Sequence, residues 1–129
     1  MVTRIEQAII SYVADRTDYR LAALDRALIE DCLFVPVSAE VTEIDVHKYD
    51  IPVICEKTKS GDGVVPAFTA VEQMLVWKPG GCKYVTVSGK SLIEMADRME
   101  GISEIMVNPG GVPRGSIPRS EFKRLLSLS

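Results

Sequence analysis

The run Val64-Val65-Pro66-Ala67-Phe68-Thr69 constrains the fold more than any other segment, because it joins an apolar strand to a helix. Continuous apolar, β-branched residues are typical of a strand that is covered on both faces. Thr69 and Glu72 stand three residues apart, which is the spacing of a capping box at a helix start. Pro66 lacks the N–H that a central strand donates, so we expect it at a strand end, a bulge or an unpaired edge.

The remaining patterns predict two helices first, and then strands mixed with helices. Helical periodicity covers residues 3–15, with Glu6 on the side away from the apolar positions. Asp18 can cap a second helix, in which Asp25 faces water. These helices either pack as a pair or leave residues 1–17 as a loose N-terminal arm. The later expected elements are a strand over 32–37, a hairpin of 51–56 with the strand from 64, a helix over 69–77, a strand over 83–87, a helix capped by Ser91 and Glu94, a strand over 104–107, and a last helix from Pro118.

This order of elements predicts an α/β fold of the mixed α+β kind, with residues 1–129 forming a single domain. We expect one mixed β-sheet of about five strands with helices packed on it. Pro36 and Pro66 occupy matching places in two apolar runs, which suggests that both strands end at one rim of that sheet. Residues 41–47 predict a weak edge strand or a loop.

Composition excludes several classes of partner. Fifteen basic and eighteen acidic side chains give a net charge of −3, which argues against nucleic acid and against an anionic membrane. The start of the chain lacks a secretion signal and no apolar window approaches a membrane span, so we expect a cytoplasmic protein. Cys32, Cys55 and Cys82 are odd in number and lie in apolar runs, which predicts buried free thiols.

Few side chains suggest a reactive centre. His47 is the only histidine, and its charged neighbours predict a solvated surface residue. The carboxylates Glu43, Asp45 and Asp50 match no calcium loop, so they predict either a hydrated acidic face or an acidic docking surface. We therefore expect no metal, no cofactor and no catalytic residue, which favours a role other than that of an enzyme.

The loop over 108–115 is the first candidate for a binding site. Loops that leave strand ends are where open α/β sheets place ligands, and two prolines stiffen this one. Its candidate contact residues are Asn108, Pro109, Gly110 and Gly111. Turn chemistry is the alternative, because Asn108 can bond to its own turn and glycine admits a positive φ.

Four further residues complete the set of candidates. Arg114 lies in the loop and Arg119 follows it, and arginines beside exposed backbone amides suit a small anionic ligand that carries a carboxylate or phosphate. Pro66 and Trp77 join the loop in a surface for a protein partner. A second interpretation of Trp77 is that it covers one edge of the core.

Three short motifs recur in order along the chain: Leu33-Phe34-Val35-Pro36-Val37, then Val65-Pro66-Ala67-Phe68-Thr69 with Trp77, and finally Val107-Asn108-Pro109-Gly110. The ordered set resembles the SseB family, in the part called the SseB N-terminal domain. The resemblance covers about Leu21 to Leu126. It implies a small soluble bacterial α/β module that acts through its surface, with no catalytic residue to carry over.

Two functions remain open at this point. The first is a non-enzymatic interaction module that binds a protein partner, or a second copy of itself, through the rim of Pro66, Trp77 and the 108–114 segment. An immunity or regulatory factor would be a special case of this function. The second is a domain that binds a small anionic molecule with the loop and the nearby arginines, with or without catalysis.

Overall fold

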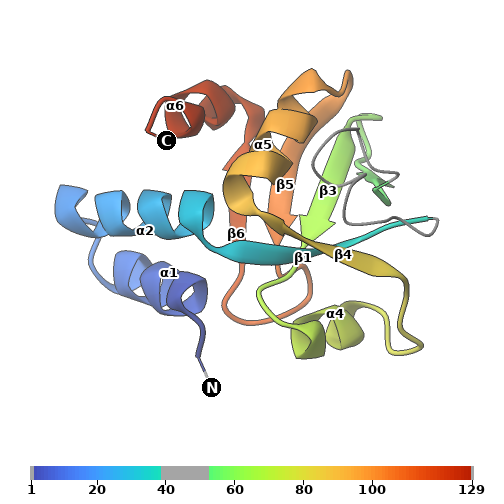
Figure 1. Cartoon of the computed structure of the whole chain (residues 1–129), viewed down its shortest axis with the longest axis horizontal. Helices are drawn as coiled ribbons and strands as arrows, with labels where there is room; N and C mark the ends of the chain where they lie inside the picture. The colour runs from blue at the N-terminus through green and yellow to red at the C-terminus, as the bar shows by residue number, and fades with distance from the viewer. Residues whose placement is uncertain (1, 39–52, 129) are drawn as a thin grey trace.

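The computed structural model describes residues 2–38 and 53–128 of the chain. The predictions for residues 41–47, and those for His47, Glu43, Asp45 and Asp50, lie outside the described residues. The elements of the described part, shown in Figure 1, are α1 (Arg4–Ala14), α2 (Asp18–Glu30), β1 (Cys32–Pro36), β2 (Glu56–Lys57), β3 (Gly63–Ala67), α4 (Val71–Trp77), β4 (Tyr84–Ser88), α5 (Gly89–Arg98), β5 (Ile102–Val107), β6 (Gly115–Pro118), the 3₁₀ turn η1 (Arg119–Glu121) and α6 (Phe122–Leu126).

The mixed α+β fold is confirmed, but the strands of the described part form two sheets instead of one. Antiparallel β1 and β4 make a two-stranded sheet, and the other four strands follow the order β2-β3-β5-β6. In the larger sheet β3 and β5 are parallel, whereas β2 and β6 pair antiparallel at its two sides. Phe34 and Phe68 join the sheets through two backbone hydrogen bonds of 2.8 Å.

The division into two sheets corrects the prediction about the prolines. Pro36 ends β1 as expected, opposite Tyr84 of β4. Pro66 lies in β3 opposite Met106 of β5, in the other sheet, so the two prolines do not share a rim. The hairpin between β2 and β3 is confirmed, although among the described residues of its first arm only Glu56 and Lys57 form a named strand.

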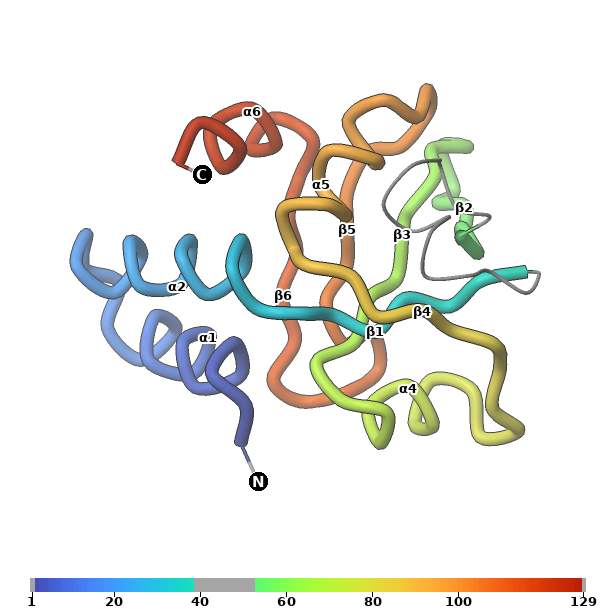
Figure 2. The backbone as a smooth tube through the Cα atoms, in the orientation of Figure 1, coloured from blue at the N-terminus to red at the C-terminus, as the bar shows by residue number. Residues whose placement is uncertain are grey.

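Helices α1 and α2 pack as a pair, so the loose-arm alternative is wrong. A capping box starts α1: the Glu6 N–H donates to the Thr3 hydroxyl, and the Thr3 N–H donates to the Glu6 carboxylate. Ile5 and Ile9 are buried in the common core, which holds the helix against the rest of the domain. Figure 2 shows α2 returning alongside α1 before the chain enters β1.

Helix α5 begins three residues earlier than the predicted pair of Ser91 and Glu94 implies. Ser88 is its N-cap and accepts a hydrogen bond from the Ser91 N–H at 3.1 Å. Gly89 follows, and its missing side chain lets the backbone approach α2: a Cβ there would stand 1.4 Å from the Leu28 carbonyl oxygen. Tertiary contact with α2 therefore sets the start of this helix.

Two further features differ from the predictions. Cys32 and Cys55 are exposed and Cys82 is half-buried, so the free thiols are not core residues. In β1 and β4, alternate side chains face the solvent, and Cys32 takes an outward position. Strand β6 was not expected, because Gly115-Ser116-Ile117-Pro118 has no run of β-favouring residues; its pairing with β5 creates it.

Candidate functional site

Thr69 does not cap α4, in contrast to the prediction from its spacing with Glu72. The helix begins after Ala70, which makes no side-chain capping bond. The buried Thr69 hydroxyl instead donates to Oε2 of Glu6 on α1, at 2.6 Å. A long-range partner thus replaces the local one, because the carboxylate of α1 reaches the start of the β3–α4 connection.

Asn108 completes this buried polar cluster from the end of β5. Its Oδ1 accepts from the Thr69 N–H at 3.0 Å, and its Nδ2 donates to the Thr69 hydroxyl at 3.0 Å and to the Pro113 carbonyl at 2.9 Å. The residue is fully buried and has a φ of 55°, a left-handed conformation that asparagine tolerates better than most residues. The turn interpretation of Asn108 is confirmed.

Glu6 is buried, contrary to the prediction that it faces water. Burial by itself raises the pKa of the Glu6 carboxyl, but hydrogen bonds from the backbone of Thr3 and from the side chains of Thr69, Thr3 and Gln73 lower it further than burial raises it. The net pKa lies below the ordinary value, so Glu6 is a carboxylate at neutral pH. Among residues 2–38 and 53–128, every buried polar side-chain atom has a hydrogen-bond partner.

The cluster of Glu6, Thr69 and Asn108 lies where the parallel strands β3 and β5 end. This edge is the usual ligand position of open α/β sheets. Here the carboxylate of α1 occupies it and accepts from Thr69, whose hydroxyl accepts in turn from Asn108 of the other loop. The cluster therefore fixes three segments of the chain to one another, and its polar atoms are already used.

The burial of Asn108 and Pro66 corrects part of the predicted contact surface, because neither side chain is accessible to a partner. Trp77 is half-buried: its indole N–H donates to Oε1 of Glu56 at 2.6 Å, and its ring centroid lies 5.4 Å from that of Phe68. It covers an edge of the core, as its second interpretation predicts. Pro109 and Gly111 are half-buried, and Gly110 is exposed.

Sequence reasoning missed an exposed apolar set beside this loop. Leu75 and Val76 on α4 are 41% and 60% exposed, and Val112 in the loop is 84% exposed. Gln73 connects the two segments, because its Nε2 donates to the Val112 carbonyl at 2.8 Å. Gln73 and Val76 stand three apart and share a helix face, so Val76 and the loop face the same side. The signal in the sequence was Leu75-Val76-Trp77, three consecutive apolar residues, which cannot all be buried in one amphipathic helix.

Arg114 and Arg119 do not form one anion site, because they flank opposite ends of β6. Arg119 acts on the backbone: its guanidinium donates to the carbonyls of Ala96, Asp97, Met99 and Ile102 at 2.7 to 3.2 Å. Three of these carbonyls lie at the end of α5 and the fourth at the start of β5, so the bonds tie η1 to both elements. Arg114 is exposed, and no hydrogen bond or ion pair within the described part of the chain engages it.

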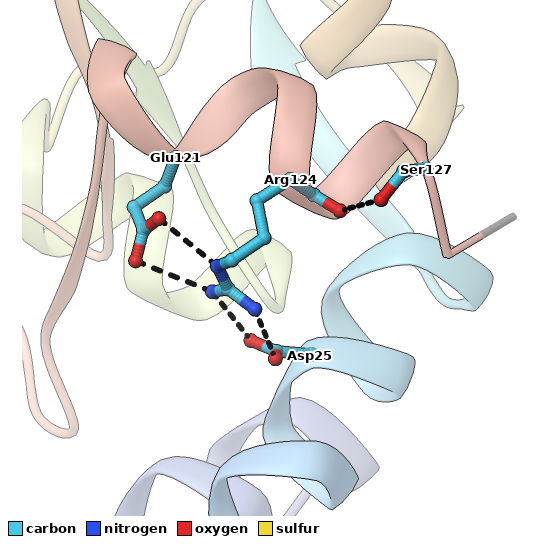
Figure 3. A network of polar contacts seen from close by, with 4 residues as sticks. All are labelled: Asp25, Glu121, Arg124 and Ser127. Atoms are coloured by element: carbon cyan, nitrogen blue, oxygen red, sulfur yellow. Dashed lines mark hydrogen bonds and ion pairs between the residues drawn. The ribbon is translucent and has the colours of Figure 1, made fainter.

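A second polar network holds α6 to α2. Arg124 donates to Oδ2 of Asp25 at 2.7 Å and to Oε2 of Glu121 at 2.9 Å, as Figure 3 shows. Hydrogen bonds to Asp25, and then to Glu121, raise the pKa of Arg124 above its ordinary value. Asp25 is buried, so the expectation that it faces water is wrong. This contact joins positions 99 residues apart and could not be found from periodicity.

Neither a metal-binding cluster nor a membrane-spanning helix is found within the described ranges. Residues 2–38 and 53–128 contain no group of three histidines, cysteines or carboxylates that could hold a metal ion. None of the helices in the same ranges is long and apolar enough to cross a membrane.

The fold and these contacts define a small α+β domain whose buried polar side chains connect its helices and loops to one another. The chain belongs to the SseB family: the model of the SseB protein N-terminal domain matches residues 5–122, nearly the whole chain. No curated protein and no solved structure matches it.

Proposed function

We propose that this chain is a non-enzymatic protein-interaction module of the bacterial cytoplasm. Its contact surface is formed by Leu75, Val76 and Val112, which we call the α4 surface. The observation that carries the proposal is the exposure of these three aliphatic side chains on two segments that are hydrogen-bonded to each other. Exposed aliphatic side chains on neighbouring segments are typical of a protein contact site.

The α4 surface is held rigidly, which favours binding. Gly111 packs so closely on Gln73 that a Cβ at Gly111 would stand 2.0 Å from Oε1 of that glutamine. Asn108 anchors the start of the same loop through its side-chain hydrogen bonds to Thr69 and Pro113. A surface that is already ordered loses little conformational entropy when a partner binds, so a larger share of the contact energy appears as affinity.

The partner that suits this surface is a protein that offers an apolar side-chain cluster or groove. The three side chains are aliphatic and carry no charge, so the contact depends on apolar burial. Burial of about 300 Å² of apolar area at roughly 25 cal/mol/Å² corresponds to several kcal/mol, before the cost of association is subtracted. The competing occupant is a second copy of this chain, bound through the same surface.

The test is affinity capture from the native cell at endogenous level, with the wild type and a V76D/V112D variant. We expect the wild type to enrich a partner that the variant loses, because a carboxylate in the contact would be buried without a counter-charge. Ile10→Asp is the matched control, since Ile10 is 44% exposed on α1, away from the α4 surface.

Three outcomes would count against the proposal. They are equal enrichment by the wild type and V76D/V112D, loss of the partner in the Ile10→Asp control alone, and a wild type that remains a monomer with no enriched protein. Sedimentation velocity separates the remaining case: a dimer that V76D/V112D converts to monomer identifies a second copy as the occupant. The alternative function, binding of a small anionic molecule, finds support in another part of the structure, where Arg114 lies.

A further inference from the structure

A pocket of about 240 Å³ lies between the helix pair α1 and α2 and the strand β6. Its apolar wall includes Ile9 from α1, Leu24 and Leu28 from α2, and Ile117 from β6. Strand β6 is the last in the order β2-β3-β5-β6, and Figure 2 shows the helix pair beside it, on the side away from β5. Residues from three elements that are distant in sequence thus form one concave apolar site.

Two arginines line the same pocket. Arg16 follows the end of α1, and Arg114 precedes β6. The Arg16 guanidinium lies 5.4 Å from the ring centroid of Tyr12, another lining residue, which orients it by a cation–π contact. No aspartate or glutamate is among the described residues that line the pocket.

The other arginines of the helix pair have a counter-charge. Elsewhere on the two helices Arg4 bonds to Glu30 and Asp31, at 3.0 and 2.9 Å. Within residues 2–38 and 53–128, neither Arg16 nor Arg114 has an ion pair with a carboxylate. On a chain whose net charge is −3, two unneutralised cations beside an apolar pocket favour an anionic group there.

We propose that this pocket binds a small monocarboxylate that carries a short apolar group. The apolar group lies against Ile9, Leu24 and Ile117, and the carboxylate is held by Arg16 and Arg114, whose planar guanidinium groups match its geometry. An apolar cavity of about 150 Å³ accommodates benzene, so this one has room for a phenyl ring or a chain of about six carbons. The proposal goes beyond the interaction role, because the pocket contains none of the three residues of the α4 surface.

The first test is a titration of the full chain followed by ¹³C-methyl NMR, with hexanoate and phenylacetate as acids and hexanamide as the neutral control. We expect saturable shifts of the methyl groups of Ile9, Leu24 and Ile117, with a Kd on the order of 1 mM for so small a ligand. Hexanamide has the same apolar chain and no charge, so it should bind at least tenfold more weakly.

Variants then test the role of the arginines. R16Q and R114Q should each weaken hexanoate binding by about tenfold or more, because each loses a charge-assisted contact. R26Q is the matched control: it makes the same change of charge on α2, at a side chain that is 71% exposed and does not line the pocket. R26Q should bind hexanoate like the wild type.

Gly115→Leu tests the position of the apolar group. A Cβ at Gly115 would lie 3.5 Å from Cδ1 of Ile9, an ordinary contact, so the rest of a leucine side chain would extend into the pocket. We expect this variant to lose hexanoate binding while its far-UV circular dichroism stays that of the wild type. If Gly115→Leu does not fold, R16Q and R114Q decide the question.

Three results would overturn the proposal. They are the absence of saturable shifts with either acid, equal binding of hexanoate and hexanamide, and R16Q and R114Q variants that bind as R26Q does. The V76D/V112D variant should bind hexanoate unchanged, so a failure of the interaction role and a failure of the pocket can be distinguished.

Discussion

The hydroxyl of Thr69 offers the sharpest test of how the domain is held together. Thr69→Val keeps the shape of the side chain and keeps the backbone N–H that donates to Asn108. It removes the hydroxyl that donates to Glu6 at 2.6 Å and that accepts from Asn108 Nδ2 at 3.0 Å. Two groups of a buried cluster therefore lose a partner in a single substitution that leaves no cavity.

The expected cost follows from the two lost bonds. A hydrogen bond to a charged group contributes about 1.5–3 kcal/mol, and a buried amide left without its acceptor costs about 1–2 kcal/mol. The methyl group of valine offsets about 1 kcal/mol of this by its apolar burial. We therefore expect Thr69→Val to lower the free energy of unfolding by about 3 kcal/mol, which for a chain of this size lowers the Tm by roughly 10 °C.

Urea denaturation at pH 7, followed by far-UV circular dichroism, measures this loss. Thr86→Val is the matched control, because Thr86 is exposed on β4 and valine is equally suited to a strand. It should change stability by less than about 0.5 kcal/mol. A double-mutant cycle of Thr69→Val with Glu6→Gln should show a coupling of about 1 kcal/mol or more, since the two side chains are in direct contact.

A Thr69→Val variant as stable as the Thr86→Val control would refute the reasoning. It would mean that water reaches Glu6 and Asn108 and replaces the hydroxyl, so that the end of β3 and β5 is open. The ends of β3 and β5 would then be a candidate position for a ligand.

Three further predictions concern other parts of the structure. Arg119→Lys should lower the free energy of unfolding by about 2–3 kcal/mol, because one ammonium cannot reach the four carbonyls that the guanidinium contacts. Arg114→Lys is the control and should leave the free energy of unfolding unchanged in the same urea experiment. Glu6 has a pKa below its ordinary 4.5 when folded, so the stabilisation by its carboxylate is present above about pH 4.5 and is lost as the pH falls through the folded pKa. In urea titrations from pH 6 to 3, the stability difference between wild type and Glu6→Gln should therefore shrink over that window. A constant difference would contradict the assignment. Gly89→Ala should not fold to a native circular dichroism spectrum, because its Cβ would overlap a carbonyl of α2, whereas Gly80→Ala has open space and should be folded; a native Gly89→Ala protein would show that α2 and α5 are not in such close contact.

The elements that the sequence predicted well are those with local signals. Residues 3–15 and the helix after Asp18 have a 3.6-residue apolar period, and both are helices in the structure. Strand β5 is a compact run of β-favouring residues and was found with its start two residues late. Strand β6 has no such run, and it exists because β5 offers it a hydrogen-bonding edge.

The candidate site was predicted less well, because polar residues carry little information about distant partners. Thr69 and Glu72 have the right spacing for a capping box, yet Thr69 bonds to Glu6, 63 positions away. Asn108 was a contact candidate with turn chemistry as the alternative, and the structure has it in a turn, since a tolerance for positive φ is a property of the residue itself. The unpaired state of Arg114 depends on which residues surround it, and no spacing in the chain gives that.

The sequence by itself determined the α+β class, the helix periods and membership of the SseB family, because periodicity and ordered motifs depend on residues close together in the chain. Only the tertiary structure decided that the strands form two sheets, that Glu6 closes the ends of β3 and β5, and that Arg16 and Arg114 line one apolar pocket. The physical reason is that burial and charge pairing depend on distances between segments far apart in the chain, which chain spacing does not encode.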